Sequence, residues 1–187
     1  AMFLAVAFSY EPTSSTRFLL YHISAALCVL VTVSSVQSEK DLKRLAAGGA
    51  IAVAISSAYA VVQRIQGVEV NAAYVDLTLN AGMPGRVDSF FDNPNTFAQV
   101  LILLLPLVLA LMLSSRSLWG KIAAAGIFAV GVLALGMTYS RASWVGIACC
   151  MVVMVFLWRP SLIPAFIILC CVAVPLLPET IWNRILT

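Results

Sequence analysis

The chain has 187 residues, of which 62% are hydrophobic and 10% charged, and its net charge is +3. Its mean hydropathy of +1.02 excludes an ordinary soluble domain, in which about 45–50% of residues are apolar. The small, scattered positive charge indicates neither a nucleic-acid-binding protein nor a polybasic lipid-binding segment. Several apolar runs are long enough to cross a hydrocarbon core of about 30 Å as helices, and they lack the alternation of membrane β-strands. The composition therefore predicts an all-α fold, a polytopic transmembrane helical bundle.

The apolar runs predict about six full spans after a partial span over residues 1–9. In chain order the full spans are expected at about residues 17–37, 45–63, 96–113, 122–137, 142–157 and 161–177. The run 45–63 is rich in Ala, Gly and Ser, which is typical of a helix that packs closely against others. Because the chain begins in apolar sequence without a charged leader region, and stops just after a span, we interpret residues 1–187 as one transmembrane domain truncated at both ends.

The short loops predict the orientation. Basic residues are concentrated in the loops 38–44, 114–121 and 158–160, which alternate on one side of the membrane. The positive-inside rule makes that side cytoplasmic. An extracytoplasmic loop over about 64–95, and the start of a large loop at about 178–187, then fall on the outer side. This arrangement would bring three arginines to the same face: Arg86, Arg141 and Arg184.

The cysteines and the histidine, which are common metal ligands, do not have the spacing of a metal site. The five cysteines all lie in apolar runs, and two pairs are adjacent in the sequence, which suits neither a zinc site nor a disulfide between neighbours. We interpret them as structural, lipid-facing or packing thiols: Cys28, Cys149, Cys150, Cys170 and Cys171. For His22, the single histidine, a hydrogen-bonded packing role is favoured over a catalytic base. The sequence contains no HExxH, GxSxG, Walker or CxxC pattern, so we predict no metal and no cofactor.

A first polar cluster, residues 138–141, joins two apolar runs with almost no loop, so Arg141 is expected at or just inside the membrane interface. An arginine at the centre of a span costs about 2.5–3.5 kcal/mol on insertion scales, and such residues usually face a polar cavity. Arg141 is either an interfacial side chain that extends to lipid headgroups or part of a phosphate site. The guanidinium suits phosphate because its donors match phosphate oxygens, and the hydroxyl of Ser140 lies beside it.

A second polar stretch, residues 82–98, contains Gly and Pro residues that force irregular backbone beside a span. Such backbone is tolerated at membrane depth only where it lines a cavity or packs inside protein. Asn95 or Thr96 is expected to cap the following helix, whose N-terminus would favour an anion. A plain capped loop is the alternative.

The same stretch carries two carboxylates whose role the sequence leaves open. Asp88 and Asp92 could accept a hydrogen bond from a sugar hydroxyl, act as a base, or pair with Arg86 and Arg64. The candidate substrate-binding residues of both clusters are Arg86, Asn93, Asn95, Ser140, Arg141 and Arg184.

These motifs resemble one family. The pattern runs from Gly85 and Arg86 to Phe90, continues through residues 92–95 into a Leu-rich span with Pro106, and ends at residues 138–144. Together the two motifs resemble the O-antigen ligase/polymerase superfamily, over roughly residues 40–187. That group includes lipopolysaccharide O-antigen ligases, Wzy-type polymerases and related oligosaccharyltransferases.

The resemblance implies a metal-independent bacterial enzyme of the inner (cytoplasmic) membrane. It would transfer or polymerise a glycan from an undecaprenyl-diphosphate carrier on the outer face, with an acceptor glycan or lipid and the membrane lipids as its other partners and no nucleic acid. Arg86 and Arg141 would hold the diphosphate. The family's catalytic His and a further Arg lie in a large loop, which His22 does not match, so the catalytic residue is expected beyond Thr187 and residues 1–187 alone are expected to be inactive.

Two other classes of protein compete with the enzyme. A transporter or flippase would use a discontinuous-helix site at residues 82–96, and this would predict a second copy of the motif, which is not visible in the sequence. A structural or assembly protein would leave both polar clusters without a role.

Overall fold

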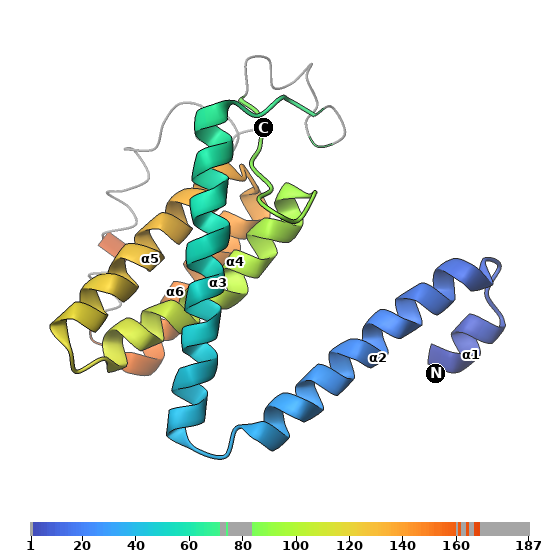
Figure 1. Ribbon diagram of the computed structural model, residues 1–187, viewed down its shortest axis with the longest axis horizontal. Helices are drawn as coiled ribbons and strands as arrows, with labels where there is room; N and C mark the ends of the chain where they lie inside the picture. Colours follow the sequence, from blue (N-terminus) through green and yellow to red (C-terminus); the bar gives the residue numbers. More distant parts are fainter. Residues whose placement is uncertain are drawn as a thin grey trace. The chain divides into compact units, whose positions relative to one another are not determined.

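The computed structural model describes residues 2–71, 74, 84–159, 161, 164 and 167–168. Helices make up its regular structure, and the described residues contain no strand (Figure 1). In chain order the helices are α1 (Met2–Ala7), α2 (Pro12–Ser35), α3 (Glu39–Gln66), α4 (Pro94–Ser114), α5 (Leu118–Met137) and α6 (Arg141–Trp158). The predicted all-α fold is confirmed.

Five helices, α2 to α6, are long and apolar enough to cross a membrane. The protein is therefore a multi-pass membrane protein, as the composition predicted. The partial first span corresponds to α1, which has six residues. The predicted last span, 161–177, lies almost entirely outside the described residues.

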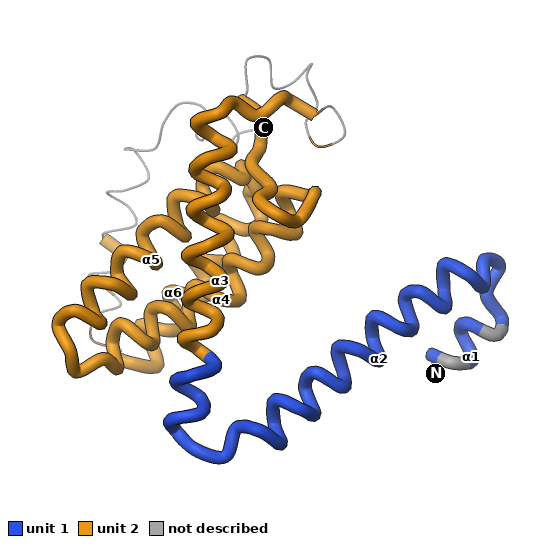
Figure 2. Tube along the Cα trace, viewed as in Figure 1, with its two compact units in different colours: residues 1–45 blue, residues 46–187 orange. Residues whose placement is uncertain are grey.

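The chain divides into two compact units, residues 1–45 and residues 46–187 (Figure 2). In the first unit α1 packs against α2, and no residue of α2 is buried. The second unit holds the hydrophobic core and both polar motifs. That residues 1–187 form one transmembrane domain stays a prediction.

The charged loop predicted at 38–44 is wrong, because α3 already begins at Glu39. Ser38 stabilises this beginning, since its hydroxyl oxygen accepts a hydrogen bond from the backbone N–H of Asp41 at 3.3 Å. One turn further, Glu39 and Lys43 form an ion pair of 2.7 Å. Acidic side chains in the first turn and opposite charges four residues apart both favour helix, so this charged sequence extends α3 instead of separating two spans.

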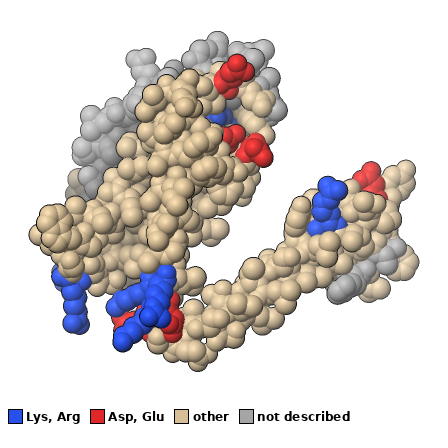
Figure 3. Space-filling model, viewed as in Figure 1, with Lys and Arg blue, Asp and Glu red and all other residues tan. Residues whose placement is uncertain are grey.

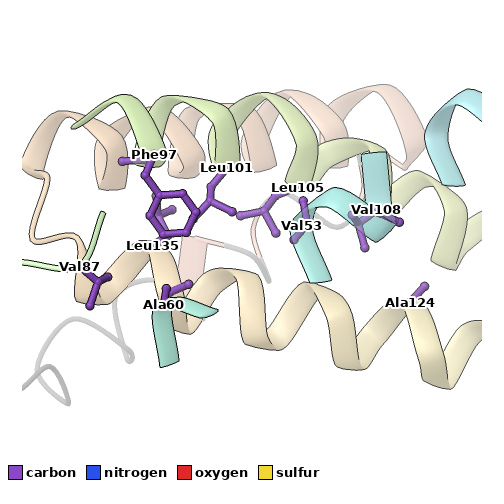
Figure 4. Close-up of a cluster of buried hydrophobic side chains, with 12 residues drawn as sticks. Val53, Ala60, Val87, Phe97, Leu101, Leu105, Val108, Ala124 and Leu135 are labelled. Atoms are coloured by element: carbon purple, nitrogen blue, oxygen red, sulfur yellow. The ribbon is translucent and has the colours of Figure 1, made fainter. Parts of the chain in front are cut away.

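Helix α4 forms the centre of the second unit. Its residues Phe97, Leu101, Leu105 and Val108 follow helical spacing and are fully buried. They pack with residues of the neighbouring helices, among them Val53 of α3 and Leu135 of α5 (Figure 4). Since lipid is as apolar as these side chains, close packing rather than exclusion of water holds such helices together in a membrane.

Helices of this core approach one another closely at Gly131 of α5. A Cβ atom at Gly131 would lie 2.6 Å from Cδ2 of Leu105 and 3.0 Å from Cγ1 of Val53. The absence of a side chain on α5 therefore lets α3, α4 and α5 meet at one point.

We expect Gly131→Ala to lower the thermal stability of the protein in detergent, because the added methyl group would overlap Leu105, whose side chain is fully buried. Overpacking of this kind costs about 1–3 kcal/mol. Gly126→Ala on the same helix is the control, since nothing lies within 4 Å of a Cβ at that position. Equal melting temperatures for the two variants would contradict this packing.

Candidate functional site

Both polar motifs lie at one end of the second unit (Figure 1). This end contains the C-terminus of α3, residues 84–93, the N-terminus of α4 and the turn between α5 and α6; residues 84–93 are called the motif segment below. The opposite end carries the α4–α5 turn with Arg116 and the first turn of α5 with Lys121. Figure 3 shows acidic side chains towards the motif segment, and Lys and Arg side chains with acidic ones among them towards the opposite end. This distribution agrees with the predicted orientation, which stays a prediction.

Arg86 joins the motif segment to three other parts of the chain. The residue is 8% exposed. Its Nε donates to the carbonyl oxygen of Thr138 at 2.6 Å, its Nη1 to the carbonyl oxygen of Tyr74 at 3.0 Å, and its Nη2 to Oδ1 of Asn95. These bonds connect the motif segment to the end of α5 and the start of α4.

The end of α3 holds the motif segment from another side. The side-chain amide of Gln63 forms hydrogen bonds with both backbone groups of Ser89. Its Oε1 accepts from the Ser89 N–H at 2.9 Å, and its Nε2 donates to the Ser89 carbonyl at 3.2 Å. Arg64 donates from Nη1 to the carbonyl of Gly85 at 3.2 Å. Gln63 is not among the predicted site residues. The feature of the sequence that could have indicated it is a polar amide in the last turns of a largely apolar helix.

The N-cap of α4 is Asn93, so the expectation of Asn95 or Thr96 is wrong. Asn93 has extended backbone, and its side chain accepts from the N–H of Asn95 at 2.8 Å. Pro94 takes the first helical position, where its fixed φ fits and its missing N–H costs nothing. Because Asn93 supplies the cap, the side chain of Asn95 is available to Arg86.

Three residues of the site other than glycine have left-handed backbone: Ser89 at φ 55°, Asp92 at φ 52° and Tyr139 at φ 50°. Such conformations cost on the order of 1–3 kcal/mol, persist only where surrounding contacts enforce them, and concentrate at functional sites. For Ser89 these contacts are the Gln63 amide and a bond of 2.8 Å from its hydroxyl to the carbonyl of Ser56. All three of these left-handed residues lie within the two polar motifs.

The α5–α6 turn is fixed by its own hydrogen bonds. Thr138 is fully buried, and its hydroxyl donates to the carbonyl of Leu135 at 2.7 Å and accepts from the N–H of Ser140 at 3.3 Å. The hydroxyl of Ser143 donates to that of Ser140 at 2.9 Å, and Trp144 Nε1 donates to the Leu135 carbonyl at 3.3 Å. The first turn of α6, which begins at Arg141, is thereby held in place.

A cavity of about 510 Å³ opens between the starts of α4 and α6, and we call it the cationic cavity. Its lining includes Arg86, Asn95, Gln99, Ile102, Ser140 and Arg141. Four of the six predicted binding residues thus meet there, whereas Asn93 serves as the cap of α4 and Arg184 lies outside the described residues. The side chain of Arg141 is exposed and has no hydrogen bond or ion pair to any residue that the structure describes.

A second cavity, of about 560 Å³, also has Arg86 in its wall, and we call it the acidic cavity. Its lining includes Tyr59, Gln63, Glu69, Tyr74, Asp88 and Asp92. Neither aspartate forms an ion pair with Arg86 or Arg64, because the ion pairs among the described residues are Lys43–Glu39 and Arg44–Asp41. The carboxylate of Asp88 accepts one hydrogen bond, from Gln63 at 3.1 Å. Most of the hydrogen-bond acceptor capacity of Asp88 and Asp92 is therefore available for a ligand.

The histidine and cysteine residues form no centre in the described part of the chain. His22 lies in the first unit, is exposed, and has Nδ1 at 2.8 Å from the carbonyl oxygen of Phe18 in its own helix. Cys28, Cys149 and Cys150 are free thiols, and the predicted packing cysteines 170 and 171 lie outside the described residues. No group of three or more potential metal ligands occurs among the residues described.

Comparisons of the chain with protein-family models, with curated proteins and with solved structures found no match. The resemblance noted from the motifs therefore stays a prediction.

Proposed function

We propose that this multi-pass protein belongs to a membrane glycosyltransferase of the O-antigen ligase type. It would transfer or polymerise a glycan from an undecaprenyl-diphosphate carrier on the outer face of the bacterial cytoplasmic membrane. The observation that carries the proposal is the cationic cavity, where Arg86 and Arg141 meet although they come from separate motifs. A lipid-linked diphosphate needs cations close to apolar surface, and Ile102 of α4 lies in the same cavity wall.

The chemistry follows from the charge of the leaving group. When the glycan leaves its carrier, negative charge builds on the diphosphate oxygens, and positioned guanidinium groups stabilise that charge. Helices α4 and α6, whose first turns line the cavity, also carry exposed apolar side chains that could contact the polyprenyl chain: Leu103 is 73% exposed and Val145 is 64% exposed.

The acidic cavity supplies the complementary chemistry for an acceptor glycan or lipid. Carboxylates accept hydrogen bonds from sugar hydroxyls, and Asp88 and Asp92 both line this cavity. Because Arg86 lies in the wall of both cavities, a hydroxyl bound on the acidic side would lie close to the diphosphate on the cationic side.

The test is the affinity of the full-length protein, reconstituted in nanodiscs, for undecaprenyl diphosphate. We expect Arg141→Gln to weaken binding roughly 10- to 100-fold, since a hydrogen bond to a charged group contributes about 1.5–3 kcal/mol. Arg159→Gln is the matched control, because Arg159 follows the C-terminus of the same helix. Equal affinities for both variants and the wild type would refute the proposal.

A flippase for the same lipid is the second candidate, favoured by the irregular backbone of the motif segment beside the start of α4. The two functions differ in what they need. A flippase moves labelled carrier across vesicles without any acceptor, whereas a glycosyltransferase releases free undecaprenyl diphosphate only when an acceptor is present.

A further inference from the structure

We infer that the two arginines of the cationic cavity have different roles: Arg141 contacts the diphosphate directly, and Arg86 is a positioning residue that fixes the turn before Arg141. This inference rests on the proposed function and deepens it, because the motifs alone assign the same role to both arginines.

The contacts of Arg86 are those of a structural connector. Nε, Nη1 and Nη2 each donate to a different acceptor, and the acceptors belong to separate parts of the chain: Thr138, Tyr74 and Asn95. Three acceptors placed around one guanidinium match the planar fork of its donors. A lysine ammonium carries its donors on one nitrogen and cannot reach three acceptors arranged around a guanidinium.

Arg141 has the opposite character. It is exposed, lies in the wall of the cavity, and makes no hydrogen bond or ion pair with the described residues. A ligand can therefore reach its guanidinium without displacing a protein acceptor.

Thr138 links the two arginines. Its carbonyl accepts from Arg86 at 2.6 Å, and its hydroxyl accepts from the N–H of Ser140, which directly precedes Arg141. The intervening Tyr139 has left-handed backbone, which needs such restraint. Without Arg86 the buried carbonyl of Thr138 would lose a partner, and the start of α6 would lose a fixed point.

Arg86 also orients Asn95. Because Oδ1 of Asn95 accepts from Arg86, the two N–H donors on Nδ2 remain for the cavity, whose wall includes this residue. Arg86 thus acts on phosphate binding indirectly, because it orients the Asn95 side chain and fixes the α5–α6 turn that precedes Arg141.

The experiment compares charge-conserving and neutral variants at both positions, with undecaprenyl diphosphate in nanodiscs as the probe. At position 141 the charge is decisive, so Arg141→Lys should keep more of the affinity than Arg141→Gln, which should bind at least about tenfold more weakly than the wild type. At position 86 the geometry is decisive, so Arg86→Lys and Arg86→Gln should weaken binding equally. Binding by Arg86→Lys that matches the wild type, with loss in Arg86→Gln, would show direct contact and overturn the inference while the proposed function survives.

A measurement on the wild type covers the case in which the Arg86 variants fail to fold. In protein labelled with ¹⁵N-arginine, the Arg86 Nε–H should exchange slowly with solvent before the lipid is added and keep its chemical shift afterwards. The signals of Arg141 should shift on addition. Fast exchange at Arg86 without lipid, or a shift at Arg86 as large as that at Arg141, would contradict the positioning role. If no signal shifts and no variant changes affinity, the proposed function itself fails.

Discussion

Replacing Gly85 with alanine is expected to disrupt the motif segment and abolish binding of the lipid diphosphate. A Cβ atom at Gly85 would lie 2.0 Å from the carbonyl oxygen and 2.5 Å from the carbonyl carbon of Val68. These are backbone atoms, which cannot rotate away as the end of a side chain can. We therefore expect a stability loss above the about 1–3 kcal/mol of ordinary overpacking, measured as a fall in melting temperature in nanodiscs.

The matched control is Gly136→Ala in the last turn of α5, near the same site. Nothing lies within 4 Å of a Cβ at Gly136, so that variant should keep both its stability and its affinity. If Gly85→Ala were as stable as Gly136→Ala and bound the lipid as well, the close passage of the motif segment beside Val68 would be wrong.

The second large effect is expected at Gln63. Gln63→Leu removes the hydrogen bonds to both backbone groups of Ser89 and the bond to Asp88. Leaving a buried backbone donor without a partner costs about 1–3 kcal/mol, and Ser89 also needs these bonds to keep its left-handed backbone. We expect a lower melting temperature together with weaker binding of undecaprenyl diphosphate, because the displaced segment carries Arg86.

Two further variants make this experiment specific. Gln63→Glu keeps an acceptor for the Ser89 N–H but loses the donor and places a carboxylate beside Asp88, so its stability should lie below the wild type as well. Gln66→Leu, on an exposed residue in the same turn region of α3, should leave stability unchanged. An effect of Gln66→Leu equal to that of Gln63→Leu would point to a general loss of polarity at this helix end.

The membrane spans could be predicted because bilayer thickness imposes a length on apolar helices, and this length is visible in the sequence. Their ends could not, because they depend on local contacts. The charged residues after Ser38 join α3 through short-range ion pairs, and Pro94 moves the cap of α4 back to Asn93. Neither the ion pairs at the start of α3 nor the N-cap of α4 is visible in the hydropathy of the sequence.

The residues of the candidate site could be predicted from the sequence, but the hydrogen bonds that join them could not. Arg86, Asn95, Ser140 and Arg141 stand out as polar residues in an apolar chain, and the structure brings them to one cavity. The neutral acceptors of Arg86 are backbone carbonyls and an amide, which every sequence contains, so only the fold shows which of them lie within reach. The same holds for Gln63, whose partners are distant in sequence.

The position of Arg86 in the walls of both cavities has a thermodynamic consequence. Any ligand in the acidic cavity that moves this guanidinium also alters the cationic cavity, so the occupancies of the two cavities are linked. Such linkage is reciprocal: if the acceptor tightens binding of the lipid by some factor, the lipid tightens binding of the acceptor by the same factor. The hydrogen bonds of one buried arginine would then set whether the two substrates bind independently or in a preferred order.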